Sequence, residues 1–136
     1  MKTAVVYYSY NGHTRDIAKN VAAEEKAEIY EIAEKKRAGK FKAYTAGIVV
    51  SIRGKAWPIE PINADLSAFD RLILLAPVWA GNPPPAFNAF LRQLPEGKNI
   101  SVKMVSMSGK SDCENRLKSV IAAKNCTLDD FSDIKA

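Results

Sequence analysis

The sequence predicts an α/β fold, a doubly wound parallel sheet with helices on both faces. Short apolar runs recur at residues 3–8, 71–76 and 100–107, and each leads through a polar loop into a segment with helical spacing. Continuous apolar runs of this length are typical of strands buried on both faces, as in the middle of a parallel sheet. The 136 residues suffice for one core. We therefore expect a single domain over residues 1–136.

The loop after the first run has the composition of a phosphate site. It joins the strand to a helix expected to continue over residues 15–22. A helix N-terminus presents unpaired N–H groups and a partial positive charge, which together hold a phosphate. A glycine lets the backbone approach a ligand closely, and hydroxyl and amide side chains donate hydrogen bonds to phosphate oxygens. The candidate phosphate-binding residues are Ser9, Asn11, Gly12, His13 and Thr14.

The type of phosphate loop follows from its pattern. Gly-Lys-Ser/Thr, the signature of nucleoside triphosphatases, does not occur in this loop, and neither does the dinucleotide fingerprint G-x-G-x-x-G. The residues present, Ser-x-Asn-Gly-x-Thr, resemble the FMN phosphate loop of the flavodoxin family. A polar strand-to-helix turn in an ordinary α/β domain is the alternative interpretation.

The loop after the second run has the composition of a site for a flat, mostly apolar ring. Trp79 offers a stacking face, the small residues after it let backbone N–H groups approach a ring, and the prolines stiffen the loop. Pro-Val-Trp-x-Gly-x-x-Pro is similar to the flavin-side loop of flavodoxin-like proteins. The candidate ring-binding residues are Pro77, Val78, Trp79, Ala80 and Gly81. Alternatively, Trp79 is a core aromatic at a strand end.

A third loop follows the strand at residues 100–107 and contains Ser108, Gly109 and Lys110. By itself, Ser-Gly-Lys-Ser is a generic turn. The resemblance implies that this loop covers the other side of a flavin, with small residues that let backbone amides reach the ring. It further implies a three-layer α/β/α sandwich with strand order 2-1-3-4-5. Non-covalent FMN binding and electron transfer complete what the resemblance implies.

The remaining segments alternate between strand and helix. An edge strand is expected at 27–32, a helix at 41–52, an extended linker at 57–62 and a turn at 65–70. A further helix is expected at 111–124, with Ser111 or Asp112 as N-cap, and a short fifth strand near 126–128.

The end of the sequence departs from the flavodoxin pattern. Flavodoxins usually end with a fifth helix over one sheet face, whereas residues 129–136 form a short polar tail. A strand such as residues 72–75 is apolar on both sides, and Ile17 and Val21 of the first helix shield only part of one face. We therefore predict a homodimer that covers the remaining strip. A truncated chain, or a tail folded over the strip, is the alternative.

The charge distribution is also unusual for a flavodoxin. Flavodoxins are typically acidic, whereas this chain has a formal net charge of +5. The basic segment contains Lys35, Lys36, Arg37, Lys40, Lys42, Arg53 and Lys55. Either it is a solvated surface, or it docks an acidic redox partner or a phosphorylated cosubstrate such as NADPH. Nucleic acid is not expected, because the segment has no recognition-helix or stacking context.

Other features limit the classes of protein. No apolar stretch approaches the ~20 residues that span a bilayer, and residues 1–3 lead directly into a strand, so we expect a cytoplasmic protein without a membrane anchor. Cys113 and Cys126 match no metal-ligand spacing and are expected to be reduced thiols. As the only histidine, His13 cannot form a multi-histidine metal site.

Three functions agree with the pattern. An FMN electron carrier needs no substrate pocket beyond the flavin. A small NAD(P)H-dependent FMN or quinone reductase needs an open flavin face. A binding module could keep the fold without the flavin. The phosphate loop argues against the last, and the absence of recognisable nicotinamide-binding residues favours the carrier. No side chain is an obvious catalytic acid, base or nucleophile.

Overall fold

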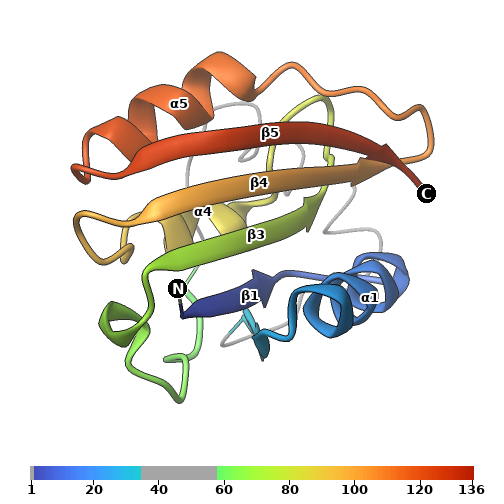
Figure 1. Cartoon of the computed structure of the whole chain (residues 1–136). Coiled ribbons are helices and arrows are strands. Elements are labelled where there is room, and N and C mark those ends of the chain that lie inside the picture. Colours follow the sequence, from blue (N-terminus) through green and yellow to red (C-terminus); the bar gives the residue numbers. More distant parts are fainter. Residues whose placement is uncertain (1, 35–57) are drawn as a thin grey trace.

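A computed structural model describes residues 2–34 and 58–136 of the chain. One parallel sheet runs through it in the order β2-β1-β3-β4-β5 (Figure 1). Its strands are β1 (Thr3–Tyr7), β2 (Glu28–Glu31), β3 (Arg71–Pro77), β4 (Asn99–Ser106) and β5 (Thr127–Lys135). The helices are α1 (His13–Glu25), α4 (Pro85–Leu91) and α5 (Glu114–Ala122), with a 3-10 turn η2 (Leu66–Ala68). The predicted strand order and parallel pairing are confirmed.

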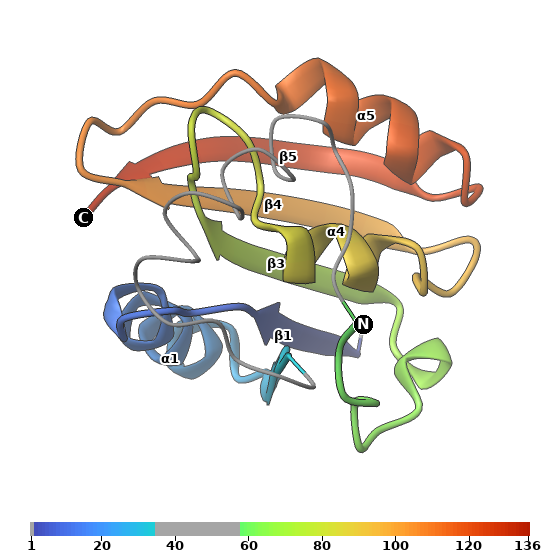
Figure 2. The same ribbon diagram turned by 180° about the vertical axis from the view of Figure 1, so that it is seen from behind.

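Helices α4 and α5 cover one face of the sheet (Figure 2). Alternate residues of a strand point to opposite faces, so Val6, Leu74 and Val102 share this face. They pack in one buried cluster with Phe87 of α4 and Leu117 of α5. This cluster is the main hydrophobic core of the described residues.

The opposite face is covered only in part. Ala18 and Ala22 of α1 pack on Val5, Ile73 and Leu75, which closes the face over β1 and β3. In Figure 1 no helix of the described residues lies across β4 and β5 on this side. Strand β5 lies at the edge of the sheet beside β4 and extends over Thr127–Lys135.

The open strip over β4 and β5 is mostly polar. Ser101 and Lys103 of β4 face it, beside Asp130 and Ser132 of β5. Ser101 is buried because the guanidinium of Arg71 covers it and donates a hydrogen bond to its hydroxyl at 2.9 Å. The sequence argument for a dimer assumed an apolar strip, and the polar side chains weaken that premise.

Two predicted boundaries were wrong. The last helix begins at Glu114 rather than at 111, and neither Ser111 nor Asp112 caps it, because N-cap Cys113 precedes it with no side-chain cap. Both expected caps are engaged elsewhere, as described below. The fifth strand is not short: β5 pairs with β4 over its whole length, and a register shift after Ile100 accommodates the extra residue.

The other predicted segments either agree with the structure or lie outside the residues that it describes. The turn expected at 65–70 contains η2, where the Asp65 carboxylate accepts a hydrogen bond from the Ser67 N–H at 3.1 Å. In the linker, Ile59 forms an isolated bridge with Glu34. The predicted helix at 41–52 and the basic segment lie outside the described residues.

Two further observations concern the composition of the fold. Cys113 and Cys126 are buried free thiols, as expected. Among residues 2–34 and 58–136, no helix has both the length and the apolar character that a membrane span requires.

The homodimer remains a prediction, and light scattering at micromolar concentration tests it. A mass of two chains is expected, because the strip over β4 and β5 lacks a cover within the described residues. The substitution Lys103→Glu should lower the dimer fraction, since Lys103 lies on that strip, whereas the substitution of Lys19 by Glu on the outer side of α1 should not. A mass of one chain across the concentration range would contradict the prediction.

Candidate functional site

The loop after β1 brings a helix N-terminus to the carboxyl edge of the sheet. Gly12 is the N-cap of α1, with φ 97°, and no side chain caps the helix there. The Ser9 hydroxyl accepts a hydrogen bond from the Gly12 N–H at 3.0 Å, which folds the loop back on itself. No atom of the described residues lies within 4 Å of where a Cβ on Gly12 would be. A small anion could therefore approach this backbone.

Side chains of the predicted phosphate loop differ in exposure. Ser9 and Thr14 are buried, while Asn11 and His13 are exposed. His13 and Thr14 belong to the first turn of α1 rather than to the loop before it. Their N–H groups are among those that an α-helix leaves without intrahelical partners.

The loop after β3 is a tight turn that leaves two N–H groups available. Trp79 and Asn82 exchange backbone hydrogen bonds at 2.8 and 3.1 Å. The two residues between them, Ala80 and Gly81, both have positive φ, 50° and 81°, as a type I′ turn requires. Within the described part of the chain, no group accepts from their N–H groups. Positive φ is uncommon at an alanine, so this turn holds Ala80 in a strained conformation.

Trp79 joins the loops after β1 and β3. Its ring makes edge-to-face contacts with Tyr8, at 6.2 Å between centroids, and with Tyr10, at 5.8 Å. The hydroxyl of Tyr8 in turn donates a short hydrogen bond to the Glu34 carboxylate. Trp79 is only partly buried. It is therefore held in place by aromatic neighbours while part of its ring stays accessible.

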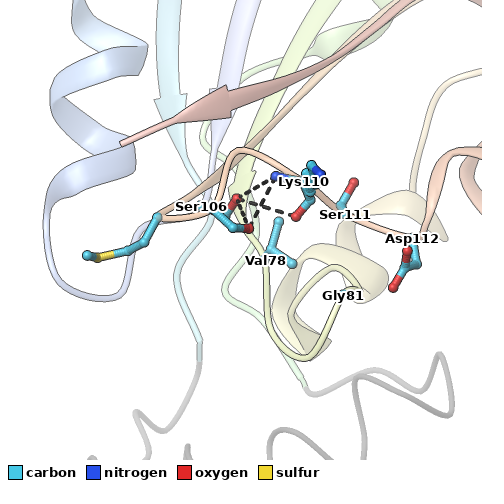
Figure 3. A pocket seen from close by; sticks show the side chains of 8 residues that line it. Val78, Gly81, Ser106, Lys110, Ser111 and Asp112 are labelled. Carbon is cyan, nitrogen blue, oxygen red and sulfur yellow. Dashed lines mark hydrogen bonds between the residues drawn. The ribbon is translucent and has the colours of Figure 1, made fainter.

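The β4 loop, residues 107–113, folds around one hydroxyl group. Ser106 ends β4, and its Oγ accepts hydrogen bonds from the N–H groups of Gly109, at 2.9 Å, and Lys110, at 3.2 Å. Gly109 has φ 72°, which this tight reversal requires. Figure 3 shows the hydrogen bonds between Ser106 and Lys110 at the centre of the loop.

The loops after β3 and β4 are joined directly. The Asp112 N–H donates to the Gly81 carbonyl at 2.8 Å. A Cβ on Gly81 would lie 2.8 Å from Oδ2 of Asp112, so the carboxylate packs over the backbone of the turn. The guanidinium of Arg116 also donates to Oδ1 of Asn82 at 3.1 Å. These contacts hold the two loops at a constant separation.

A cavity of about 640 Å³ lies between these two loops. Figure 3 shows it at the carboxyl edge of the sheet. It is lined by Val78, Gly81, Ser106, Met107, Ser108, Lys110, Ser111 and Asp112. Its volume is within the range of small-molecule sites. Met107 is 83% exposed, which is unusual for a large apolar side chain.

The structure brings together part of the predicted site. Of the predicted residues, the cavity is lined by Val78, Gly81, Ser108 and Lys110. The same two loops contain Trp79, Ala80 and Gly109, and Pro77 ends β3, but none of these four lines the cavity. The phosphate-loop residues lie after β1. The contact between Tyr10 and Trp79 connects that loop to the loop after β3, which borders the cavity.

Four lining residues were not among the predicted ones: Ser106, Met107, Ser111 and Asp112. A serine three residues before a glycine at a strand end could have indicated the turn around Ser106. Ser111 and Asp112 were interpreted as helix caps, because Ser and Asp are common N-caps. No sequence pattern indicates that Asp112 reaches Gly81 in another loop.

Electrostatic effects near the site involve residues that do not line the cavity. Burial raises the pKa of the Cys113 thiol, which keeps it protonated and unreactive at neutral pH. Burial also raises the pKa of Tyr7, and the carboxylate of Glu31 adds to that effect. Arg15 forms an ion pair with Glu31 at 3.3 Å, beside the phosphate loop. Within the described ranges, no group of three His, Cys, Asp or Glu side chains could hold a metal ion.

Comparison with known proteins identifies the fold. No family model and no curated protein matches the sequence. A flavoprotein of Lactobacillus acidophilus NCFM, solved in complex with FMN, has a TM-score of 0.71 and 18% identity, over 96% of this chain and 91% of that chain. A protein of Bacteroides eggerthii DSM 20697, provisionally named a flavoprotein, has a TM-score of 0.80 and 20% identity, over 96% and 86%. Oxidised flavodoxin 2 of Bacillus cereus has a TM-score of 0.58 and 16% identity, over 99% and 84%. The chain therefore has the flavodoxin-like fold.

The central role of Ser106 can be tested without a ligand. Ser106→Ala removes the acceptor of two N–H groups, so amide exchange at Gly109 and Lys110 should accelerate. The free energy of unfolding should fall by about 1 kcal/mol. Ser108→Ala is the control for exchange at Gly109. The Ser108 Oγ accepts from the Lys110 N–H at 3.3 Å and lies 3.5 Å from the Ser106 Oγ, whereas the Gly109 N–H donates to Ser106. Unchanged exchange in Ser106→Ala would show that the β4 loop does not depend on this hydroxyl.

Proposed function

We propose that this chain binds FMN non-covalently at the carboxyl edge of its sheet. The observation that carries the proposal is a glycine-capped helix N-terminus, connected through Trp79 to a cavity of about 640 Å³. In doubly wound sheets, ligands bind at the carboxyl ends of the strands, where the strand order reverses. Here that point lies between β1 and β3. The FMN complex of a protein with the same fold supports this choice of ligand.

The phosphate of FMN fits the loop after β1. The negative charge of the phosphate would be stabilised by the positive end of the α1 dipole. The phosphate oxygens would accept hydrogen bonds from the N–H groups at the start of α1, where no side chain caps the helix. Thr14 and Asn11 would supply hydroxyl and amide donors. The glycine at position 12 leaves the approach free of a side chain. Ser9 and His13 complete the proposed phosphate site.

The ring system fits the cavity between the other two loops. Val78 gives an apolar contact, and the free N–H groups of Ala80 and Gly81 could donate to polar atoms at the ring edge. Pro77 and Trp79 would border the ring on the β3 side. Ser108, Gly109 and Lys110 would border it on the β4 side. The flavin itself supplies the redox chemistry, and the protein contributes burial, orientation and hydrogen bonds.

FMN should bind at least about tenfold more tightly than riboflavin, because each charge-assisted hydrogen bond to the phosphate contributes about 1.5–3 kcal/mol. Titration followed by flavin fluorescence measures both affinities. Thr14→Val, which keeps the shape of the side chain and removes the hydroxyl, should reduce the difference, whereas Thr14→Ser should preserve it. Equal affinity for the two ligands would contradict the phosphate site.

Trp79 fluorescence should be quenched when FMN binds, because the ring borders the proposed flavin site. Trp79→Phe should remove most of the quenching and retain the fold, since Phe can keep the aromatic contacts with Tyr8 and Tyr10. The comparison variant Trp57→Phe removes the other tryptophan of the chain, so that its fluorescence reports on Trp79 alone. If Trp79→Phe keeps the whole quenching signal, another part of the chain contacts the ring.

We further propose electron transfer as the activity, with the basic segment at residues 35–55 as the docking site for an acidic redox partner. The opposite charges would attract, so the rate of electron transfer should fall as salt is added. A carrier should not oxidise NADPH in the presence of a quinone without a separate reductase. Rapid catalytic NADPH oxidation by the purified protein would instead support the NAD(P)H-dependent reductase.

A further inference from the structure

The carboxyl end of β5 and the residue after it make three contacts with the end of β4 and the β4 loop. The Ser111 hydroxyl donates to Oδ1 of Asp133 at 2.6 Å. The Ala136 N–H donates to the carbonyl of Ser106 at 2.8 Å. A Cβ on Gly109 would lie 3.2 Å from Cβ of Lys135, so strand and loop are in close contact there. The last strand therefore supports the loop that closes the cavity.

Of these contacts, the hydrogen bond to Asp133 is made by Ser111, which lies between two anchored parts of the loop. On one side of Ser111, the Ser106 hydroxyl holds Gly109 and Lys110. On the other side, Asp112 donates to the turn after β3. Ser111 is the link between these two anchored parts. Among residues 2–34 and 58–136, its side chain is held by Asp133 and by a 3.6 Å contact with the Cys113 thiol. Ordering a backbone residue costs conformational entropy, and the bond to Asp133 offsets part of that cost at Ser111.

We propose that Asp133 is a positioning residue, which holds the β4 loop in the cavity-forming conformation through Ser111 and thereby sets the affinity for the flavin. This inference rests on the proposed function. Asp133 does not line the cavity, so its effect passes through Ser111. Its bond involves a charged acceptor, which makes it stronger than a bond between neutral groups.

A long-range charge effect predicts a different pattern. If the negative charge of Asp133 only repelled the flavin phosphate, removing the charge would tighten binding in Asp133→Ala and Asp133→Asn alike. A positioning role requires an acceptor oxygen, which Asn retains and Ala lacks. The two variants therefore separate the two explanations.

Two measurements test the inference in the full-length chain. Amide exchange at Asp112, in protein without flavin, reports whether the loop stays attached to Gly81. Titration with FMN then reports the affinity. In Asp133→Ala the exchange should accelerate and the dissociation constant should rise about tenfold. Asp133→Asn keeps a weaker, neutral acceptor, so both measurements should fall between those of Asp133→Ala and the unaltered protein. Asp130→Ala is the matched control, because Asp130 is exposed on the same strand and faces the open strip.

The outcomes are distinct. Unchanged exchange or unchanged FMN affinity in Asp133→Ala overturns the inference, and so does equal behaviour of Asp133→Ala and Asp133→Asn. Failure of the unaltered protein to bind FMN refutes the proposed function instead. In that case the exchange measurement still decides whether Asp133 holds the loop. Thermal unfolding followed by circular dichroism confirms that each variant is folded.

Discussion

The pairing of β3 with β4 is the constraint on which the candidate site depends. Leu74 lies beside Val102 and Pro77 beside Val105, so the two strands end level with each other. The Val78 N–H continues this pairing by donating to the Val105 carbonyl at 3.0 Å. Because parallel strands direct their carboxyl ends to the same edge, the two following loops must meet there. The cavity between them is a consequence of that register.

The two loops at this edge of the sheet are held in place by different contacts. The turn after β3 is held by its own backbone hydrogen bonds and by the aromatic contacts of Trp79. The β4 loop folds around the hydroxyl of Ser106 at the end of β4, and it is also held by the turn after β3 and by β5. A site built in this way is organised before any ligand arrives, which lowers the entropic cost of binding. The edge strand β5 contacts this loop through the hydrogen bond between Ser111 and Asp133, although no β5 residue lines the cavity.

In the part of the chain that the structure describes, no helix covers the strip over β4 and β5, and the sequence of β4 fits such a face. Parallel strands are usually apolar on both faces, yet β4 alternates, with Val102 and Met104 toward the helices and Ser101 and Lys103 toward the open side. The long side chain of Arg71 further shields Ser101. This pattern reduces the free-energy cost of exposing the face to water, whatever covers it in solution.

Local patterns predicted the doubly wound parallel sheet and the polar loops between each strand and the following helix, because each depends on residues close together in sequence. The strand order 2-1-3-4-5 and the role of the β4 loop came from the resemblance to flavodoxins. Apolar runs indicate buried strands, and a glycine between a strand and a helical segment indicates a tight loop. The roles of Ser111, Asp112 and Asp133 were decided only by the tertiary structure. Serine and aspartate can either cap a helix or form hydrogen bonds with groups distant in sequence. Here the strand register brings Gly81 and β5 within reach, and that decides their partners.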